Sequence, residues 1–282
     1  MQSPIKWVGG KSQSAKKICE LIPEHDCYCE IFFGGGWVFF NKEISKVEVI
    51  NDVNGELINF YRVLQRSGTS FIERSKLEMY SKELYEEYKR DFSSGKHLEM
   101  NDVERAFRFY CMLRQAFSGR FGSGWGYSAT RNEAEVFFRS LDSIEQITKR
   151  LKNVQIDCRD FEAVIDGFDG EKTVFVCDPP YLQSDNSNYE FEGNKFTLYD
   201  HQRLYLKLKN IKGKFLLTID DSEFIRERYC GNSGEFHVLE NEVFYSGSDS
   251  DSRKHVKELI IMNYNSLEMK KHVDYGQGKL NF

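Results

Sequence analysis

Residues 173–181 read Thr-Val-Phe-Val-Cys-Asp-Pro-Pro-Tyr, and this stretch indicates the fold. Its first five residues are apolar or β-branched, as expected of a strand that is buried on both faces of a parallel sheet. Because proline lacks an amide hydrogen and fixes its own φ, Pro179 and Pro180 should end the strand abruptly. Open α/β sheets bind ligands at the carboxyl ends of their strands. The stretch therefore predicts a central strand followed by a site that holds a carboxylate, Asp178, and an aromatic ring, Tyr181.

The N-terminal part of the chain shows the same alternation of strand and helix. A first helix is predicted within 5–21. It is followed by a strand at 27–33, a glycine loop at 34–36 and a helix at 37–44. A second strand at 47–50, an acidic turn at 51–52 and a helix at 57–65 come next. Further strands are predicted at 154–158, 173–177 and 215–219, and a final pair, 235–245 and 257–264, could be antiparallel. This order is typical of a doubly wound sheet. The predicted fold class is therefore α/β, with a Rossmann-like sheet that carries a helical insert.

The region between the two α/β parts differs in charge as well as in pattern. We expect an α/β domain formed by residues 1–60 and 154–282 and a helical domain formed by residues 61–153. The whole chain has a net charge of −5, but residues 61–155 alone carry +4. Residues 106–131 contain no acid, and their arginines and aromatic residues are Arg108, Arg114, Arg120, Arg131, Phe107, Phe109, Tyr110, Phe117, Phe121, Trp125 and Tyr127. Such a patch is a plausible nucleic-acid footprint, and a helical core with solvated arginines would read the same way.

Composition argues against several other classes of protein. No apolar run approaches the ~18 residues needed to span a bilayer, and the N-terminus leads into a glycine turn and not into a signal segment. We expect a soluble, cytoplasmic protein that does not bind membranes. The seven cysteines lack the paired spacing of zinc sites, so we expect reduced, buried thiols and no metal.

Four further segments are ambiguous when each is taken alone. Glycines at 34–36 permit positive φ and let a ligand approach the backbone, but a ligand-free turn needs the same residues. Asp52 could accept hydrogen bonds from a ribose or cap a helix, or do both. Asp160 and Phe161 could bind an adenine, or could be a helix cap and a core ring. The segment 6–11 begins with a lysine and a tryptophan, which are more often surface and core residues than ligand contacts.

Together these segments resemble the DNA adenine-N6 methyltransferases of the Dam family. The matching pieces occur in the family's order and span nearly the whole chain: Lys6-Trp7-Val8-Gly9-Gly10-Lys11, Glu30-Ile31-Phe32-Phe33-Gly34-Gly35-Gly36, Asn51-Asp52-Val53-Asn54, Asp160-Phe161, Asp178-Pro179-Pro180-Tyr181 and Arg253-Lys254-His255-Val256-Lys257-Glu258-Leu259. The Asp-Pro-Pro-Tyr turn alone is moderately specific, and the ordered set is strongly so. The helical insert falls where the family carries its target-recognition domain. The resemblance implies a site-specific DNA adenine-N6 methyltransferase from a bacterium or a phage.

The resemblance also implies S-adenosylmethionine as the methyl donor. The implied cofactor-binding residues are Trp7, Gly9, Gly10, Lys11, Glu30, Phe32, Gly34, Gly36, Asp52, Asn54, Asp160, Phe161 and Asp178. Among them Asp52 would bind the ribose, and Asp160 and Phe161 would hold the adenine. The chain departs from the family at Ile31, where proline is usual, and at Trp37, where a small residue is usual. We expect the Trp37 indole to face the core.

The implied catalytic residues are Asp178, Pro179, Pro180 and Tyr181. The Asp178 carboxylate and the Pro179 carbonyl would each accept a hydrogen from adenine N6, which favours a tetrahedral nitrogen whose lone pair faces the sulfonium methyl group. A paired adenine must flip out of duplex DNA to reach such a site, and Tyr181 would stack on it.

Target reading would belong to the insert and to the last strand. The expected DNA-binding residues are Arg114, Phe117, Arg120, Trp125, Tyr127, Arg253 and Lys254. We expect most aromatic residues of the insert to be core residues and about two to touch DNA. The family often methylates adenine in GATC, but residues 105–131 do not match its usual recognition loop, so the target stays open. So do the oligomeric state, taken here as monomeric, and any link to a restriction system.

Three alternatives remain at this level. Cytosine N4 or adenine in RNA could be the acceptor, because the argument from Asp178 does not distinguish the rings. A catalytically silent DNA-binding homologue is the third, and the intact segments 34–36 and 178–181 argue against it.

Overall fold

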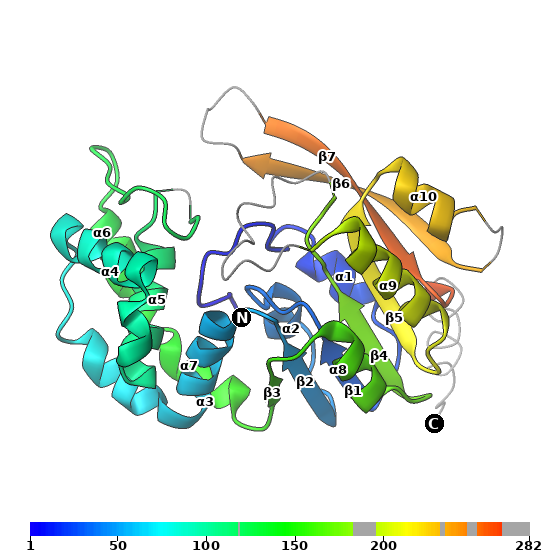
Figure 1. Ribbon diagram of the computed structural model, residues 1–282, viewed down its shortest axis with the longest axis horizontal. Helices are drawn as coiled ribbons and strands as arrows, with labels where there is room; N and C mark the ends of the chain where they lie inside the picture. The colour runs from blue at the N-terminus through cyan, green and yellow to red at the C-terminus, as the bar shows by residue number, and fades with distance from the viewer. Residues whose placement is uncertain (118, 183–195, 232–234, 247–252, 267–282) are drawn as a thin grey trace, which may run out of the picture.

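A sheet of seven strands runs through the protein in the order β3-β2-β1-β4-β5-β7-β6 (Figure 1). Its strands are β1 (Cys27–Glu30), β2 (Val47–Asn51), β3 (Gln155–Asp157), β4 (Thr173–Cys177), β5 (Lys214–Asp220), β6 (His237–Ser246) and β7 (Arg253–Met262). The computed structural model describes residues 1–117, 119–182, 196–231, 235–246 and 253–266, and only the backbone of 243–246 and 253–256. β1 to β5 pair in parallel, whereas β7 is antiparallel to both β5 and β6. The predicted α/β class and the final antiparallel pair are therefore confirmed.

β4 is the central strand that its sequence predicts. It lies between β1 and β5, and all five of its residues are buried. Because side chains alternate along a strand, Val174 and Val176 point into one core and Phe175 and Cys177 into the other. This double burial explains why the strand is apolar after Thr173, whose hydroxyl donates to the Phe168 carbonyl at 2.8 Å.

Helices cover both faces of the sheet. On one face lie α1 (Ala15–Leu21), α2 (Trp37–Asn41) and the start of α3 (Gly55–Ser75), and on the other lie α8 (Phe161–Phe168), α9 (Leu198–Lys209) and α10 (Glu223–Tyr229) (Figure 1). The first helix follows a turn at Gly9, as the sequence predicts, but it begins only at Ala15 because residues 12–14 form a further turn. α3 is longer than predicted and has a non-helical residue, Ser67, in its middle.

The insert stands beside the β3 edge of the sheet and is helical, as the sequence predicts (Figure 1). It consists of the rest of α3, α4 (Lys82–Ser94), a 3-10 turn η1 (Lys96–Glu99), α5 (Asp102–Arg114), α6 (Glu133–Leu141) and α7 (Ile144–Leu151). One continuous core joins it to the sheet, since Tyr28 of β1, Phe60 of α3 and Phe107 of α5 belong to the same buried cluster. The division at residue 61 falls inside α3, so a two-domain organisation remains a proposal.

The contact between α3 and α7 gives a test of this packing. A Cβ atom on Gly68 of α3 would lie 2.4 Å from Thr148 Oγ1 and 2.8 Å from Thr148 Cγ2 on α7. Alanine normally stabilises a helix by ~1 kcal/mol relative to glycine. Here we expect Gly68→Ala to lower the free energy of unfolding by about 1–3 kcal/mol, because the added methyl overpacks the contact. Urea titration would measure the change.

The control for this prediction is the double variant Gly68→Ala/Thr148→Ala, compared with Thr148→Ala alone. Removing the threonine branch should recover most of the loss. A Gly68→Ala protein that is as stable as the wild type would contradict the packing of α3 against α7.

Candidate functional site

Three segments that are distant in the sequence meet at the carboxyl end of β4. The turn 178–181 leaves β4, Lys11 comes from the N-terminal turn, and Glu258 comes from β7. Glu258 reaches this end because β7 is antiparallel: its register pairs Glu258 with Asp220, the last residue of β5. The strand order therefore brings a carboxylate from near the C-terminus to the site predicted from residues 173–181.

Lys11 connects these segments. Its Nζ lies 2.7 Å from Asp178 Oδ1, 2.8 Å from the Tyr181 hydroxyl and 3.7 Å from Glu258 Oε1, and it donates to the Gly9 carbonyl at 3.2 Å. Only 5% of the Lys11 side chain is exposed. Such a buried ammonium group is stable only with this set of partners, because an unpaired charge away from water costs several kcal/mol.

Asp178 is held through one oxygen. Thr218 on β5 donates to Oδ1 at 2.8 Å, and Lys11 contacts the same atom. Both of these contacts leave Oδ2 for another donor, and 24% of the side chain is exposed. Burial raises the pKa of Asp178 above the ordinary value, Lys11 and Thr218 act to lower it, and the Glu258 charge acts to raise it. The arrangement can present a carboxylate oxygen in a fixed direction to an amino group.

The glycine loop lies beside this cluster and is held by Asp52. Gly34 and Gly36 have φ of +48° and +66°, which glycine adopts without strain. The Gly34 amide donates to Asp52 Oδ2 at 2.9 Å. Asp52 is not the N-cap of α3, as one alternative held: that residue is Asn54, which accepts from the Leu57 amide at 2.9 Å. Burial raises the pKa of Asp52, while the backbone amides that donate to it act to lower the pKa.

Two tryptophans pack against the glycines of this region. A Cβ atom on Gly34 would lie 2.8 Å from the Trp7 indole, and one on Gly10 would lie 3.0 Å from the Trp37 indole. Trp37 is half-buried and belongs to neither hydrophobic core. The expectation that Trp37 faces the core is therefore wrong: the indole covers the backbone of Gly10, which only a residue without a side chain leaves open.

Glu30 lies beneath the loop at the end of β1. It is 4% exposed, and it accepts a hydrogen bond from the Tyr28 hydroxyl at 2.6 Å and another from the Phe39 amide. Burial raises the pKa of Glu30 to about 8. Among the described residues, its contacts are thus with the protein interior.

Asp160 and Phe161 begin α8 on the other side of the loop. Asp160 caps α8 by accepting from the Glu162 amide at 3.0 Å, and it pairs with Arg203 at 2.8 Å. The Phe161 ring lies 5.7 Å from Phe32, centroid to centroid, in the second core cluster. The cap and the core ring are therefore both observed, and a role in binding a ligand stays a prediction.

Sequence reasoning missed three residues at this site. Thr218 is a hydroxyl in an otherwise apolar strand, a signal that could have been recognised. Glu258 lies within the matching segment 253–259, whose sequence does not indicate a role for it. His201 of α9 is buried, its ring donates a hydrogen bond to the Pro180 carbonyl of the turn, and burial lowers its pKa to about 4. No local pattern distinguishes His201 from a surface histidine.

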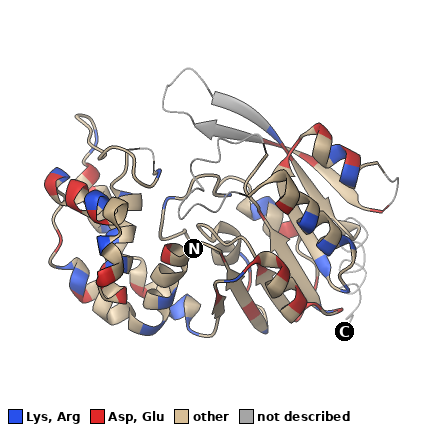
Figure 2. Ribbon diagram, in the orientation of Figure 1, with Lys and Arg blue, Asp and Glu red and all other residues tan. Residues whose placement is uncertain are grey.

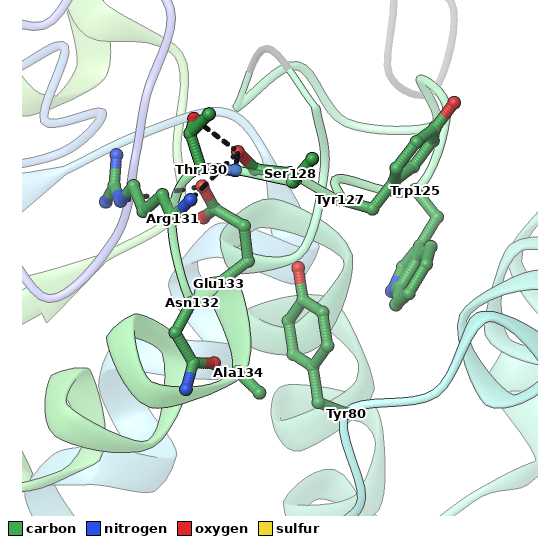
Figure 3. Close-up of a pocket in the computed structure, with 10 residues that line it drawn as sticks. Tyr80, Trp125, Tyr127, Ser128, Thr130, Arg131, Asn132, Glu133 and Ala134 are labelled. Atoms are coloured by element: carbon green, nitrogen blue, oxygen red, sulfur yellow. Dashed lines mark hydrogen bonds and ion pairs between the residues drawn. The ribbon is translucent and has the colours of Figure 1, made fainter.

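The insert carries a pocket of about 540 Å³ (Figure 3). Tyr80, Trp125 and Tyr127 line one side and Arg131 and Glu133 the other, and the Trp125 and Tyr127 rings stack with centroids 6.1 Å apart. Most aromatic residues of 106–131 are core residues, as predicted. The two that are largely exposed are Phe117 (64%) and Tyr127 (74%).

The arginines of the insert differ in exposure and in whether acidic residues balance their charge. Figure 2 shows acidic and basic residues interspersed over its helices. Arg108 is engaged by Glu104, Glu87 and Asp91, so its charge is balanced inside the insert. Arg114 is half-buried, whereas Arg120 and Arg131 are exposed. The side chains of Arg253 and Lys254 lie outside the described residues.

Two features are absent from the described residues. These residues contain no cluster of three or more His, Cys, Asp or Glu residues suited to a metal ion. Likewise, none of their helices combines the length and apolar character needed to cross a membrane. None of the seven cysteines, all of which lie among the described residues, forms a disulfide bond.

Comparison with known proteins gives a consistent picture. The profile of the D12 class N6 adenine-specific DNA methyltransferases matches residues 7–246. The Type II methyltransferase M1.LlaDCHI of Lactococcus lactis subsp. cremoris is 33% identical over 92% of this chain and 94% of its own length. A DNA N-6-adenine-methyltransferase of Escherichia phage P1 is 30% identical over 81% of this chain and 31% of its own length. The DNA adenine methylase of Haemophilus influenzae is 25% identical over 92% of each chain.

The raised pKa of Glu30 predicts a pH dependence of stability. Between the ordinary pKa of 4.5 and about 8, the folded protein keeps a proton that the unfolded chain has lost. Stability should therefore fall as the pH rises through this range, by about 1 kcal/mol per pH unit from this group. Glu30→Gln cannot titrate and keeps an acceptor for Tyr28, so its stability relative to wild type should increase from pH 5 to pH 8.

Urea unfolding at several pH values would measure this difference. Glu43→Gln, at an exposed position, is the matched control and should show no trend. A constant difference between Glu30→Gln and wild type over the range would refute the buried, protonated state.

Proposed function

The chain belongs to the D12 class of N6-adenine-specific DNA methyltransferases, and we propose that it methylates adenine N6 within a specific sequence of duplex DNA, with S-adenosylmethionine as the methyl donor. The enzymatic class follows from the family; the donor, the duplex substrate and the residue roles are proposed. The observation that supports the roles best is the Asp178 carboxylate, fixed through Oδ1 by Lys11 and Thr218 with Oδ2 left for a donor.

The chemistry of the site suits a cationic donor. Asp52, Asp178, Asp220 and Glu258 lie at the carboxyl edge of the sheet, and the Lys11 ammonium balances only part of their charge. A negative site favours a positively charged ligand, here a sulfonium. S-adenosylmethionine, when bound, supplies an electrophilic methyl group.

We propose roles for the loop residues around this donor. The backbone of Gly9, Gly10, Gly34 and Gly36 would lie against it, between the Trp7 and Trp37 indoles. Asp52, Asn54 and Phe32, with Asp160 and Phe161, would hold its nucleoside part. Glu30 would act from beneath, by supporting the loop through α2.

We propose that the turn 178–181 activates the acceptor. The adenine N6 lone pair is delocalised into the ring, so the amino group is a poor nucleophile. Hydrogen bonds from N6 to Asp178 Oδ2 and to the Pro179 carbonyl would favour a tetrahedral nitrogen with a localised lone pair. Pro180 fixes the turn, and the Tyr181 ring would stack on the base. The contribution of these groups would be orientation and electrostatics, since their positions are set before the base arrives.

The insert would bind the duplex. Arg120 and Arg131 are exposed, and so are Phe117 and Tyr127, which suits phosphate contacts and a ring inserted where a base has left. Trp125 and Arg114, which are half-buried, would also contact the DNA. We propose the same role for Arg253 and Lys254. Adenine is favoured over cytosine and over RNA by the family and by the names of the phage P1 and Haemophilus influenzae relatives.

One experiment tests the acceptor and the target together. Unmethylated genomic DNA would be incubated with the protein and S-adenosylmethionine and then read by long-read sequencing that detects modified bases. We expect N6-methyladenine in one short context. N4-methylcytosine, or transfer to RNA alone, would contradict the proposal.

The role of Asp178 gives a direct prediction. Asp178→Asn keeps the size of the side chain but removes the charge, so we expect methyl transfer to fall by about 10²–10³-fold or more, with binding of S-adenosylhomocysteine largely retained. Tritium transfer and calorimetry would measure the two quantities. Asp166→Asn, on the exposed side of α8, is the matched control. Transfer at the wild-type rate by Asp178→Asn would exclude the assignment.

The ion pair with Lys11 predicts a shift in the pH profile. Lys11 acts to lower the pKa of Asp178, which burial raises. Lys11→Met should therefore raise this pKa further, so that less Asp178 is ionised at a given pH. The acidic limb of kcat/KM against pH should move to higher pH, and Thr218→Val should move it in the same direction. An acidic limb that is unchanged in both variants would show that Asp178 is not the titrating group.

A further inference from the structure

Glu258 is a buried carboxylate that the proposed function uses only as part of the negative charge of the site, with no contact to the acceptor base. It is 0% exposed, and its Oε1 accepts a hydrogen bond from the Tyr181 hydroxyl at 2.8 Å and lies 3.7 Å from Lys11 Nζ. We propose that Glu258 is a positioning residue for the acceptor base: through Tyr181 and Lys11 it fixes the ring on which the base stacks and the ammonium that orients Asp178. This inference rests on the proposed function, in which Tyr181 is the stacking face.

The Tyr181 hydroxyl is held from two directions. A phenol has one O–H donor, which Glu258 accepts, and Lys11 donates to the same oxygen at 2.8 Å. Lys11 Nζ lies 4.8 Å from the ring centroid, so it contacts the hydroxyl end of the ring and not its centre. Two hydrogen bonds from different segments fix the plane of the ring and leave stacking to its faces.

Glu258 also determines where Lys11 can lie. The ammonium group sits between two carboxylates, Asp178 at 2.7 Å and Glu258 at 3.7 Å. Without the Glu258 charge, Asp178 alone would attract Lys11. The Tyr181 hydroxyl would still accept from Lys11 but would no longer donate to a carboxylate. Both the ring and the Asp178 oxygen would then be less well placed, and small misplacements of reacting groups cost up to about 100-fold in rate.

The carboxylate itself is supported by the last two strands. Asn241 on β6 lies opposite Glu258 in the register, and its Nδ2 is 3.5 Å from Glu258 Oε2. Lys17 of α1 donates to Asn241 Oδ1 at 2.8 Å. The sheet thus fixes Glu258 from behind, which a positioning group requires.

The test is a double-mutant cycle of Glu258→Gln and Tyr181→Phe. Single-turnover methyl transfer would be measured with tritiated S-adenosylmethionine on unmethylated genomic DNA, and S-adenosylhomocysteine binding by calorimetry. We expect each single variant to lower the transfer rate by about 10–100-fold, with cofactor binding within about threefold of wild type. Because both variants lose the hydrogen bond between Tyr181 and Glu258, the rate loss of the double variant should be clearly smaller than the product of the two single losses. The matched control is Glu240→Gln, because the Glu240 carboxylate on β6 is exposed and pairs with Arg226. This variant should transfer methyl groups at the wild-type rate.

Several outcomes would overturn the proposal. A Glu258→Gln rate within twofold of wild type would do so, as would single effects that multiply in the double variant. If Glu258→Gln does not fold, Tyr181→Phe decides, because a folded Tyr181→Phe with the wild-type rate would show that the hydroxyl positions nothing. Failure of the proposed function would look different: Asp178→Asn would stay active, or the wild-type protein would modify no adenine.

Discussion

The buried ion pair between Lys11 and Asp178 is the interaction on which the site depends. It joins the N-terminal turn to the end of β4 at 2.7 Å, and both side chains have other partners that fix them. A buried pair of this kind contributes little net stability, because desolvation offsets the attraction. The ion pair instead orients the carboxylate, because it holds Asp178 Oδ1 and leaves Oδ2 for another donor. The glycine loop, Tyr181 and Glu258 are arranged around that constraint.

Hydrophobic packing fixes the insert relative to the same site. The N-terminal segment that carries Lys11 also carries Trp7, whose ring lies 6.5 Å from Phe109 of α5. Because one core runs from β1 through α3 into α5, the helices of the insert are fixed relative to the end of β4. A surface on the insert can therefore hold a large substrate at a constant distance from Asp178, which a loosely tethered module could not do.

Particular residues show how far the sequence could be interpreted. β4, the glycine loop and the helical insert were predictable, because burial on two faces, positive φ and helical periodicity leave clear local patterns. The contacts of Asp52 and Trp37 were not predictable, because they depend on neighbours far along the chain. For Asp52 the alternatives are a helix cap and a contact with the glycine loop, and for Trp37 they are the core and the backbone of Gly10. Arg108 looked like part of a basic patch, but Glu87 and Asp91 balance it from a different helix.

The sequence by itself determined the α/β class, the position of the Asp178–Tyr181 turn and the family, because these depend on short motifs in a fixed order. Only the tertiary structure decided which oxygen of Asp178 is held, that Thr218 holds it, and that Glu258 reaches Tyr181. The physical reason is the antiparallel insertion of β7 between β5 and β6, which places residue 258 beside residue 220. No local pattern encodes that register, since it arises when the last strands pair with a sheet built from earlier parts of the chain.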